Sequence, residues 1–363
     1  MENAVNHERW MARCLQLARR GATSAAPNPL VGSVLVQGDR ALAEGWHERP
    51  GTGHAEVRCL SAFGPGAVPA DATLYVNLEP CAHHGRTPPC ADLIIARGIR
   101  SVVIGHEDPF PAVAGQGIAR LRRAGISIHV GVLEAEARWL NRRFLTSIVA
   151  GRPYVVLKWA RSADGLIDQA GRSVRGGTPI SGAASNILVH RWRSEEQAIL
   201  VGGMTVLHDD PSLTVRHVAG RQPLRVVLDR SGVAPAGSRL FTDGGPTLLF
   251  TGQPRPDINV EQLVISQGSN ALDGILKVLH ERQIRSVLVE GGARTHEAFF
   301  AAGLWDEARV IEAPLVLGSG TKAPSPQGVV QSAISVEADR VVTYARSAEL
   351  RRPEMVTLSD PWC

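Results

Sequence analysis

Short apolar stretches alternate with helical patterns along the whole chain, and this alternation constrains the fold more than any other feature of the sequence. Strands separated by helices of ordinary length are typical of βαβ units, so the first series predicts an α/β domain. Its strands are expected at residues 30–37, 41–46, 73–78, 101–105 and 126–130, and its helices at 5–20, 54–62, 92–97, 116–124 and 134–149.

The segment Ala150-Gly151-Arg152-Pro153 interrupts this alternation with residues that end and restart helices. A length of 363 residues also favours two domains. We therefore predict domains at 1–150 and 151–363, the second being another α/β sheet with an antiparallel C-terminal edge. Its strands are expected at 154–159, 198–201, 224–228, 247–250, 263–266, 286–290 and 309–312, and its helices at 183–194, 273–282 and 294–302.

Composition excludes several classes of protein. The net charge of +4 comes from 39 basic and 35 acidic residues without a basic block, so nucleic acid is not an expected partner, whereas small anionic substrates suit it. Five cysteines at irregular spacing do not indicate a disulfide framework. The N-terminus MENAVNHERWMARC has no apolar core of a signal peptide, and no apolar run is long enough to span a membrane. These features predict a cytoplasmic protein.

One group of residues indicates metal chemistry. Gly53-His54-Ala55-Glu56 is followed by Glu79-Pro80-Cys81 and, after eight further residues, by Cys90. One imidazole and two thiolates form a natural three-ligand set for Zn²⁺, and the fourth position left open to water is typical of catalytic zinc. Bound zinc makes hydroxide available at neutral pH. Glu56 is well placed to handle a proton.

The order H-x-E, P-C and C is the signature of zinc-dependent nucleobase deaminases, in which the glutamate is the general acid and base. The spacing of eight residues between Cys81 and Cys90 departs from the two residues of that signature. A structural zinc site and unrelated buried cysteines are the alternatives.

Longer motifs identify a family. Pro27-Asn28-Pro29, the run from Glu79 to Cys90 and Asp108-Pro109 resemble the bifunctional deaminase/reductase of riboflavin biosynthesis, and the eight-residue spacing is that of this family. The resemblance implies a cytidine-deaminase-like, three-layer first domain. It also implies zinc-dependent deamination of 2,5-diamino-6-(5-phosphoribosylamino)pyrimidin-4(3H)-one.

The resemblance suggests further residues for this site. Asn28, in a turn flanked by prolines, would bond the pyrimidine edge, and its alternative is an ordinary turn residue. His47 and His83 would contact the substrate or its phosphate, or orient a zinc ligand. Arg86 would hold the ribose phosphate. Ordinary surface or loop positions remain the alternatives for these three.

The second domain lacks the G-x-G-x-x-G fingerprint of dinucleotide binding. Its segment from Val289 to Thr295 nevertheless places Gly291-Gly292 between a strand and a helix, where the backbone can approach a phosphate. By itself this pattern is weak evidence for phosphate binding.

Together with the segment Lys158 to Gly165, the motifs of the second domain resemble the reductase half of the same family, whose fold is similar to dihydrofolate reductase. The resemblance implies that NADPH reduces the ribosyl side chain of the deaminated pyrimidine to ribityl. The substrate residues that it suggests are Lys158, Arg193, Leu213, Arg216 and Glu290. The cofactor residues that it suggests are Ala160, Ile167, Thr205, Asp209, Arg230, Gly292, Ala293, Arg294 and Thr295.

Specific roles follow for some of these residues. Arg193 and Arg216 would clamp the substrate phosphate. Lys158 and Glu290 would bind ribose hydroxyls or assist proton transfer. Arg230 would pair with the 2′-phosphate of NADPH. The alternatives are helix-face or strand-end charges.

The chain departs from many relatives in the loop at 169–179, where Thr178-Pro179-Ile180-Ser181 stands in place of a Trp-Ile-Ser/Thr run and removes an aromatic surface near the cofactor.

Three rival functions remain. The chain could deaminate another pyrimidine or a nucleic-acid base, with a degenerate second domain. It could be a non-enzymatic zinc-binding interaction protein. Finally, only one half could be active. The leading hypothesis is the bifunctional enzyme, with phosphorylated pyrimidine substrates and a homo-oligomer, dimer or tetramer, formed through the reductase domain.

Overall fold

The structure is a computed structural model that describes residues 6–82, 88–110, 114–171, 175–265 and 271–347. The chain divides into two compact units, and the division falls between Ala150 and Gly151. Each unit has its own sheet and its own apolar core, so each is described by itself.

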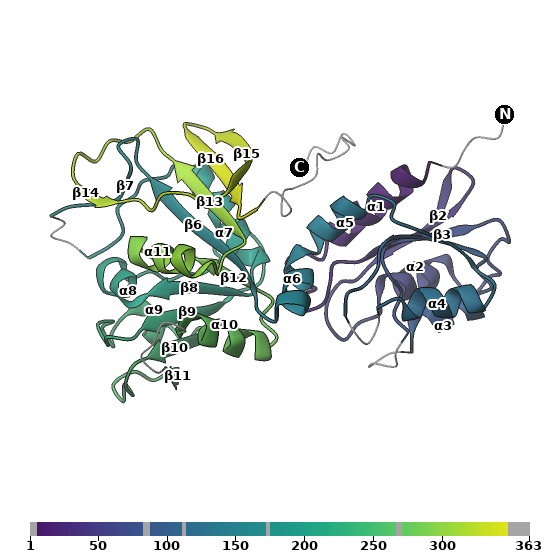
Figure 1. Ribbon diagram of the computed structural model, residues 1–363, viewed down its shortest axis with the longest axis horizontal. Helices are drawn as coiled ribbons and strands as arrows, with labels where there is room; N and C mark the ends of the chain where they lie inside the picture. The colour runs from purple at the N-terminus through teal and green to yellow at the C-terminus, as the bar shows by residue number, and fades with distance from the viewer. Residues whose placement is uncertain (1–5, 83–87, 111–113, 172–174, 266–270, 348–363) are drawn as a thin grey trace. The chain divides into compact units, whose positions relative to one another are not determined.

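A five-stranded sheet in the order β2-β1-β3-β4-β5 organises the first unit (Figure 1). β1 pairs with β2 and β3 in antiparallel fashion, whereas β3, β4 and β5 are parallel. The inner strands are apolar on both faces, as expected for a sheet covered on both sides. The strands are β1 (Gly32–Gln37), β2 (Arg40–Trp46), β3 (Thr73–Leu78), β4 (Ser101–His106) and β5 (Ser127–Val130).

Helices cover both faces of this sheet. α1 and α5 pack on one face, and α2, α3 and α4 pack on the other (Figure 1). The predicted three-layer α/β unit is therefore confirmed. The helices are α1 (His7–Arg19), α2 (Ala55–Phe63), α3 (Cys90–Ala96), α4 (Gln116–Arg123), α5 (Glu134–Leu140) and α6 (Arg142–Ala150).

The single helix expected at 134–149 is wrong, because the structure has α5 and α6 with Asn141 between them. The Asn141 side chain is buried and turns toward the backbone of Leu30, where it accepts from the N–H and donates to the carbonyl. This side chain competes for backbone partners, as asparagine does at helix ends.

The second unit contains a nine-stranded sheet in the order β11-β10-β9-β8-β12-β6-β13-β16-β15. Its strands are parallel from β11 to β13, and β16 and β15 are antiparallel, which confirms the expected C-terminal edge. The strands are β6 (Tyr154–Arg161), β8 (Ala198–Gly202), β9 (Leu224–Asp229), β10 (Thr247–Thr251), β11 (Glu261–Val264), β12 (Ser286–Val289), β13 (Glu307–Glu312), β15 (Val329–Val336) and β16 (Asp339–Ala345).

Helices again cover both faces of the sheet, with α7, α8 and α9 on one face and α10 and α11 on the other. β7 (Leu166–Gln169) and β14 (Gly320–Lys322) form a separate two-stranded sheet. The elements β7, β14, α8 and α9 are short and were not predicted from the sequence. The helices are α7 (Ala183–Glu195), α8 (Gly203–Asp209), α9 (Arg239–Thr242), α10 (Ala271–Glu281) and α11 (Ala293–Ala302).

This topology directs the carboxyl ends of β6, β8, β9 and β12 to one edge of the sheet, which is where ligands bind in open α/β sheets. Among the described helices, none combines the length and the apolar character that crossing a membrane requires.

Two glycines allow the helices of the first unit to approach its sheet closely. A Cβ atom on Gly32 in β1 would lie 2.1 Å from the carbonyl oxygen of Cys14 in α1. A Cβ atom on Gly45 in β2 would lie 2.4 Å from the backbone nitrogen of Cys59 in α2. Because these neighbours are backbone atoms, they cannot rotate away, and any side chain here separates a helix from the sheet.

We expect the substitution Gly32→Ala to destabilise the first unit by about 1–3 kcal/mol through overpacking. Thermal unfolding of the full chain measures this as a lower temperature for the first unit's transition. Gly66→Ala is the matched control, since a Cβ atom at Gly66 meets no atom within 4 Å. Equal stability of the two variants would contradict the close approach of α1 to β1.

Candidate functional site

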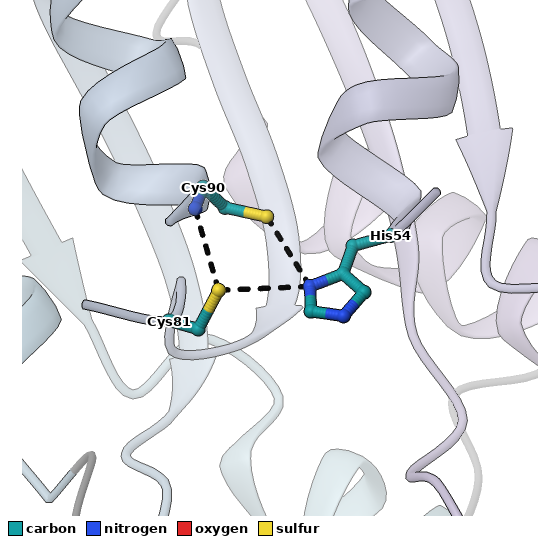
Figure 2. Close-up of side chains that lie close together, drawn as sticks. All are labelled: His54, Cys81 and Cys90. Atoms are coloured by element: carbon teal, nitrogen blue, oxygen red, sulfur yellow. Dashed lines mark hydrogen bonds between the residues drawn. The ribbon is translucent and has the colours of Figure 1, made fainter. Parts of the chain in front are cut away.

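Three side chains from separate elements of the first unit lie close together (Figure 2). His54 lies at the N-cap of α2, Cys90 begins α3, and Cys81 lies in the loop after β3. The Nδ1 atom of His54 is 3.6 Å from the sulfur of Cys81 and 3.3 Å from that of Cys90. Metal ions in proteins are bound mainly by His, Cys, Asp and Glu. In the described part of the chain, this is the one cluster of three such residues whose ligand atoms all lie within 4.8 Å of one another.

These distances fit a tetrahedral zinc ion. Ligands with ordinary Zn–S and Zn–N bond lengths, placed at tetrahedral angles, have sulfur and nitrogen atoms about 3.6 Å apart. The structure thus brings together the three side chains that the sequence predicted as a ligand set. Three protein donors leave a fourth position for water or substrate, which is typical of a catalytic zinc site.

The electrostatics of the cluster differ between its two sulfurs. Hydrogen bonds from the Cys90 side chain, from His54 and from the Cys90 backbone N–H lower the pKa of Cys81 to about 4, so this sulfur is a thiolate at neutral pH. The same contact with Cys81, together with burial, raises the pKa of Cys90. Thiolate, not thiol, is the form of cysteine that binds metals.

Glu56 lies in the first turn of α2, two residues after His54, and is only 3% exposed. Burial raises its pKa to about 7, and its carboxylate interacts with His54 and with Cys90. A carboxylate with a pKa near the working pH can accept and donate a proton with similar ease. Its position and its pKa therefore suit the general acid and base predicted from the sequence.

Asn28 and His47 contact each other beside this cluster. The Asn28 side-chain nitrogen is 3.0 Å from Nε2 of His47, and the Nδ1 atom of His47 is 3.3 Å from the carbonyl oxygen of Gly53. The His47 ring is buried, and this burial lowers its pKa. Both of its nitrogens therefore have protein partners, which the sequence did not predict. His83 and Arg86 lie outside the described residues.

Glu79 is a residue of the site whose role the sequence analysis missed. Its buried carboxylate accepts hydrogen bonds from the backbone N–H groups of Asp108, Gly115 and Ile118. It thereby fastens the loop before α4 and the first turn of α4 to the segment that carries Cys81. The motif Glu79-Pro80-Cys81 was visible in the sequence, but nothing in it indicated these partners.

In the second unit, Lys158, Glu290 and Arg193 form a charge cluster whose side chains are largely shielded from solvent. The Glu290 carboxylate receives two hydrogen bonds from Arg193, at 2.7 and 2.8 Å, and lies 3.8 Å from the Lys158 ammonium. Burial alone would raise the pKa of Glu290, but the two cations hold it at about 2. Burial lowers the pKa of Lys158; the charge of Glu290 opposes this effect, and the charge of Arg193 adds to it.

Arg193 also joins this cluster to the segment after α8. It donates to the carbonyl of Thr214 at 3.2 Å, next to the predicted substrate residue Leu213. The backbone N–H of Arg216 donates to Nδ1 of His190 at 3.1 Å. His190 was not predicted as a site residue, because its contact joins two segments that are distant in the sequence.

The predicted cofactor residues fall into separate groups. Thr205 accepts a hydrogen bond from the backbone N–H of Gly292 at 3.1 Å, so α8 meets the N-terminus of α11. A Cβ atom on Gly202 or on Gly291 would lie within 3 Å of Thr295, so only glycine fits these turns. These glycine turns therefore let the N-terminus of α11 pack closely against β8 and α8.

The remaining cofactor residues lie farther apart. Arg230, directly after β9, and Arg294, in the first turn of α11, are exposed. Asp209 ends α8, and Ala293 begins α11. Ala160 and Ile167 pack against the apolar clusters of opposite faces of the sheet.

Family models match both units. The model described as "Cytidine and deoxycytidylate deaminase zinc-binding region" matches residues 4–106, and that described as "RibD C-terminal domain" matches residues 153–349. The chain is 41% identical to the riboflavin biosynthesis protein RibD of Aquifex aeolicus over 318 residues, which cover 86% of this chain and 88% of that protein.

Solved structures of similar proteins have the same fold over nearly the whole chain. RibD of Acinetobacter baumannii superposes with a TM-score of 0.84 at 36% identity, over 93% of this chain and 98% of that chain. The diaminohydroxyphosphoribosylaminopyrimidine deaminase/5-amino-6-(5-phosphoribosylamino)uracil reductase of Thermotoga maritima gives a TM-score of 0.84 at 36% identity, over 93% and 97% of the two chains. The chain therefore belongs to the RibD family of riboflavin biosynthesis enzymes, which join a zinc-dependent deaminase to an NADPH-dependent reductase.

Proposed function

We propose that the first unit, residues 1–150, hydrolytically deaminates 2,5-diamino-6-(5-phosphoribosylamino)pyrimidin-4(3H)-one, and that the second, residues 151–363, reduces the ribosyl chain of the product to ribityl with NADPH. The observation that carries the first step is the meeting of His54, Cys81 and Cys90 beside buried Glu56. The second step is supported by the charge cluster around Glu290.

In the deaminase step, His54, Cys81 and Cys90 would hold the zinc ion. Zinc supplies a Lewis acid that makes water nucleophilic at neutral pH. Glu56 takes a proton from the attacking water and delivers a proton to the leaving amino group, so that water and the amine become a carbonyl and ammonia. Asn28 bonds the pyrimidine edge, whereas His83 and Arg86 remain candidates for contacts to substrate and phosphate.

In the reductase step, NADPH supplies the hydride. Arg216 binds the substrate phosphate. Arg193 contributes to this contact only through the N–H groups that Glu290 and Thr214 leave free. Leu213 lies in the same segment as Thr214 and Arg216. Lys158 and Glu290 bind ribose hydroxyls and assist proton transfer to the opening sugar. Because the Lys158 ammonium is buried and its pKa is lowered, it loses a proton more readily than an exposed lysine. The cofactor residues are those named above, with Arg230 facing the 2′-phosphate.

A zinc-binding interaction protein without activity would need neither Glu56 in its buried position nor the ion pairs of Glu290. A deaminase with a degenerate second domain would not need those ion pairs either. Both arrangements support the bifunctional enzyme over these alternatives.

We also propose a cytoplasmic homo-oligomer formed through the second unit. β15 is an edge strand, and its exposed apolar residues Val329, Val330 and Ile334 support this, since exposed edge strands are usually covered. The molar mass in solution, measured by light scattering, is expected to be two or four times the 38.8 kDa of one chain. A monomeric mass at micromolar concentration would contradict the proposal.

The substitution Glu56→Gln tests the deaminase assignment. Because the amide cannot exchange protons, we expect ammonia release from the diaminopyrimidine to fall by a factor of about 10² to 10⁴. Zinc content and NADPH oxidation with the deaminated substrate should not change. Glu44→Gln, at a partly buried glutamate of the same unit that pairs with Arg13, is the control. Undiminished ammonia release from Glu56→Gln would refute the mechanism.

The substitution Lys158→Met tests the reductase assignment. Removing the buried ammonium beside Glu290 should lower kcat/KM for NADPH oxidation by about 100-fold or more, because proton transfer and ribose binding are both lost. Ammonia release should stay at the wild-type rate. Lys277→Met, at an exposed position on α10, is the matched control. If both variants reduce the substrate as fast as the wild type, Lys158 has no part in the reaction.

A further inference from the structure

The two nitrogens of the His47 ring have partners that determine which of them carries the proton. The carbonyl oxygen of Gly53 can only accept, so Nδ1 of His47 must donate to it across 3.3 Å. In a neutral imidazole the other nitrogen is then an acceptor. Nε2 therefore accepts from the side-chain NH₂ of Asn28, which is 3.0 Å away.

This contact also sets the orientation of the Asn28 carboxamide. Since its nitrogen is turned toward His47, its oxygen is turned away from the ring. Within the residues that the structure describes, no group donates a hydrogen bond to that oxygen, and the Asn28 side chain is only half-buried. Asn28 thus keeps one acceptor that none of the described residues uses.

The backbone that carries Asn28 is held on several sides. Asn77 and Asn141, both buried, donate their side-chain amides to the carbonyl of Leu30 at 3.0 Å. Asn141 also accepts from the N–H of Leu30, and Asn77 accepts from the N–H of Gly32, both at 2.7 Å. The position of Asn28 is therefore fixed before any substrate binds, and only the rotation of its amide remains to be determined.

The pair of Asn28 and His47 lies next to the metal cluster. The His47 ring meets the ring of His54 edge-on, with 5.5 Å between their centroids. Gly53, which accepts from His47, directly precedes His54. The Asn28 carboxamide thus contacts a ring that itself contacts a predicted zinc ligand.

We propose that His47 is a positioning residue that aims the carboxamide oxygen of Asn28 at the deaminase substrate. Asn28 then accepts a hydrogen bond from a ring or exocyclic N–H group of an aminopyrimidine. The site would favour heterocycles that present a donor at this edge over those that present an acceptor. This inference rests on the proposed deaminase function and assigns to His47 an action through Asn28 in place of a contact with the substrate.

A double-mutant cycle tests this role on the zinc-loaded full chain. We expect Asn28→Ala and His47→Leu each to lower kcat/KM for ammonia release by about 10- to 100-fold, mainly through KM. The double variant should be no worse than Asn28→Ala alone, because His47 has nothing left to orient. His7→Leu, which removes a partly buried histidine bonded to Tyr75 far from the cluster in sequence, is the matched control and should keep the wild-type rate.

Three outcomes would overturn the inference. If the losses of the single variants multiply in the double variant, His47 contacts the substrate itself. If His47→Leu loses zinc, it acts through His54. If His47→Leu keeps the wild-type kcat/KM, it has no role. The thermal transition of the first unit in each variant reports whether that unit is folded.

The tautomer gives a second measurement that needs no variant to be active. Long-range ¹H–¹⁵N correlation spectra of the histidine-labelled wild-type protein should show His47 protonated at Nδ1 and not at Nε2, with the signal assigned by its loss in His47→Leu. Protonation at Nε2 would overturn the inference. If the wild type releases no ammonia, the proposed function fails, whereas this spectrum still decides the orientation of the pair.

Discussion

The deaminase unit depends on the convergence of one imidazole and two sulfurs from elements that are far apart in the sequence. His54 and Cys90 lie at the starts of two helices that pack on the same face of the sheet, and Cys81 reaches them from the loop after β3. The backbone N–H of Cys90 donates a hydrogen bond to the Cys81 sulfur. The start of α3 therefore stabilises the thiolate form of Cys81. Metal affinity and the packing of α2 and α3 are therefore linked.

Groups around this cluster act mainly by restricting motion. Glu79 binds the start of α4 to the Cys81 segment, and Asn77 and Asn141 hold the backbone beside Asn28. The second unit uses charge instead, because Glu290 binds Arg193 and Lys158 in a buried setting where each cation needs a partner. In both clusters the side chains are thus held by protein partners, and such preorganisation reduces the reorganisation that a reaction requires.

The alternation of strands and helices predicted both sheets and their layers, because buried strands and amphipathic helices leave strong periodic patterns. The spacing of His54, Cys81 and Cys90 predicted the cluster, because metal ligands are restricted to few residue types. The break at Asn141 was not predictable, since it depends on a hydrogen bond to Leu30. The partners of His47, Glu79 and Arg216 could not be predicted either. They are backbone groups or side chains of other segments, which only the folded chain brings together.

X-ray absorption at the zinc edge of the full-length protein tests the central assignment most directly. The account predicts a shell of two sulfurs at about 2.3 Å, one imidazole nitrogen at about 2.0–2.1 Å and one further light atom. It also predicts that Cys81→Ser removes one of the two sulfurs from that shell. A zinc shell with no sulfur, or with three or four, or one that keeps both sulfurs in Cys81→Ser, would contradict the assignment.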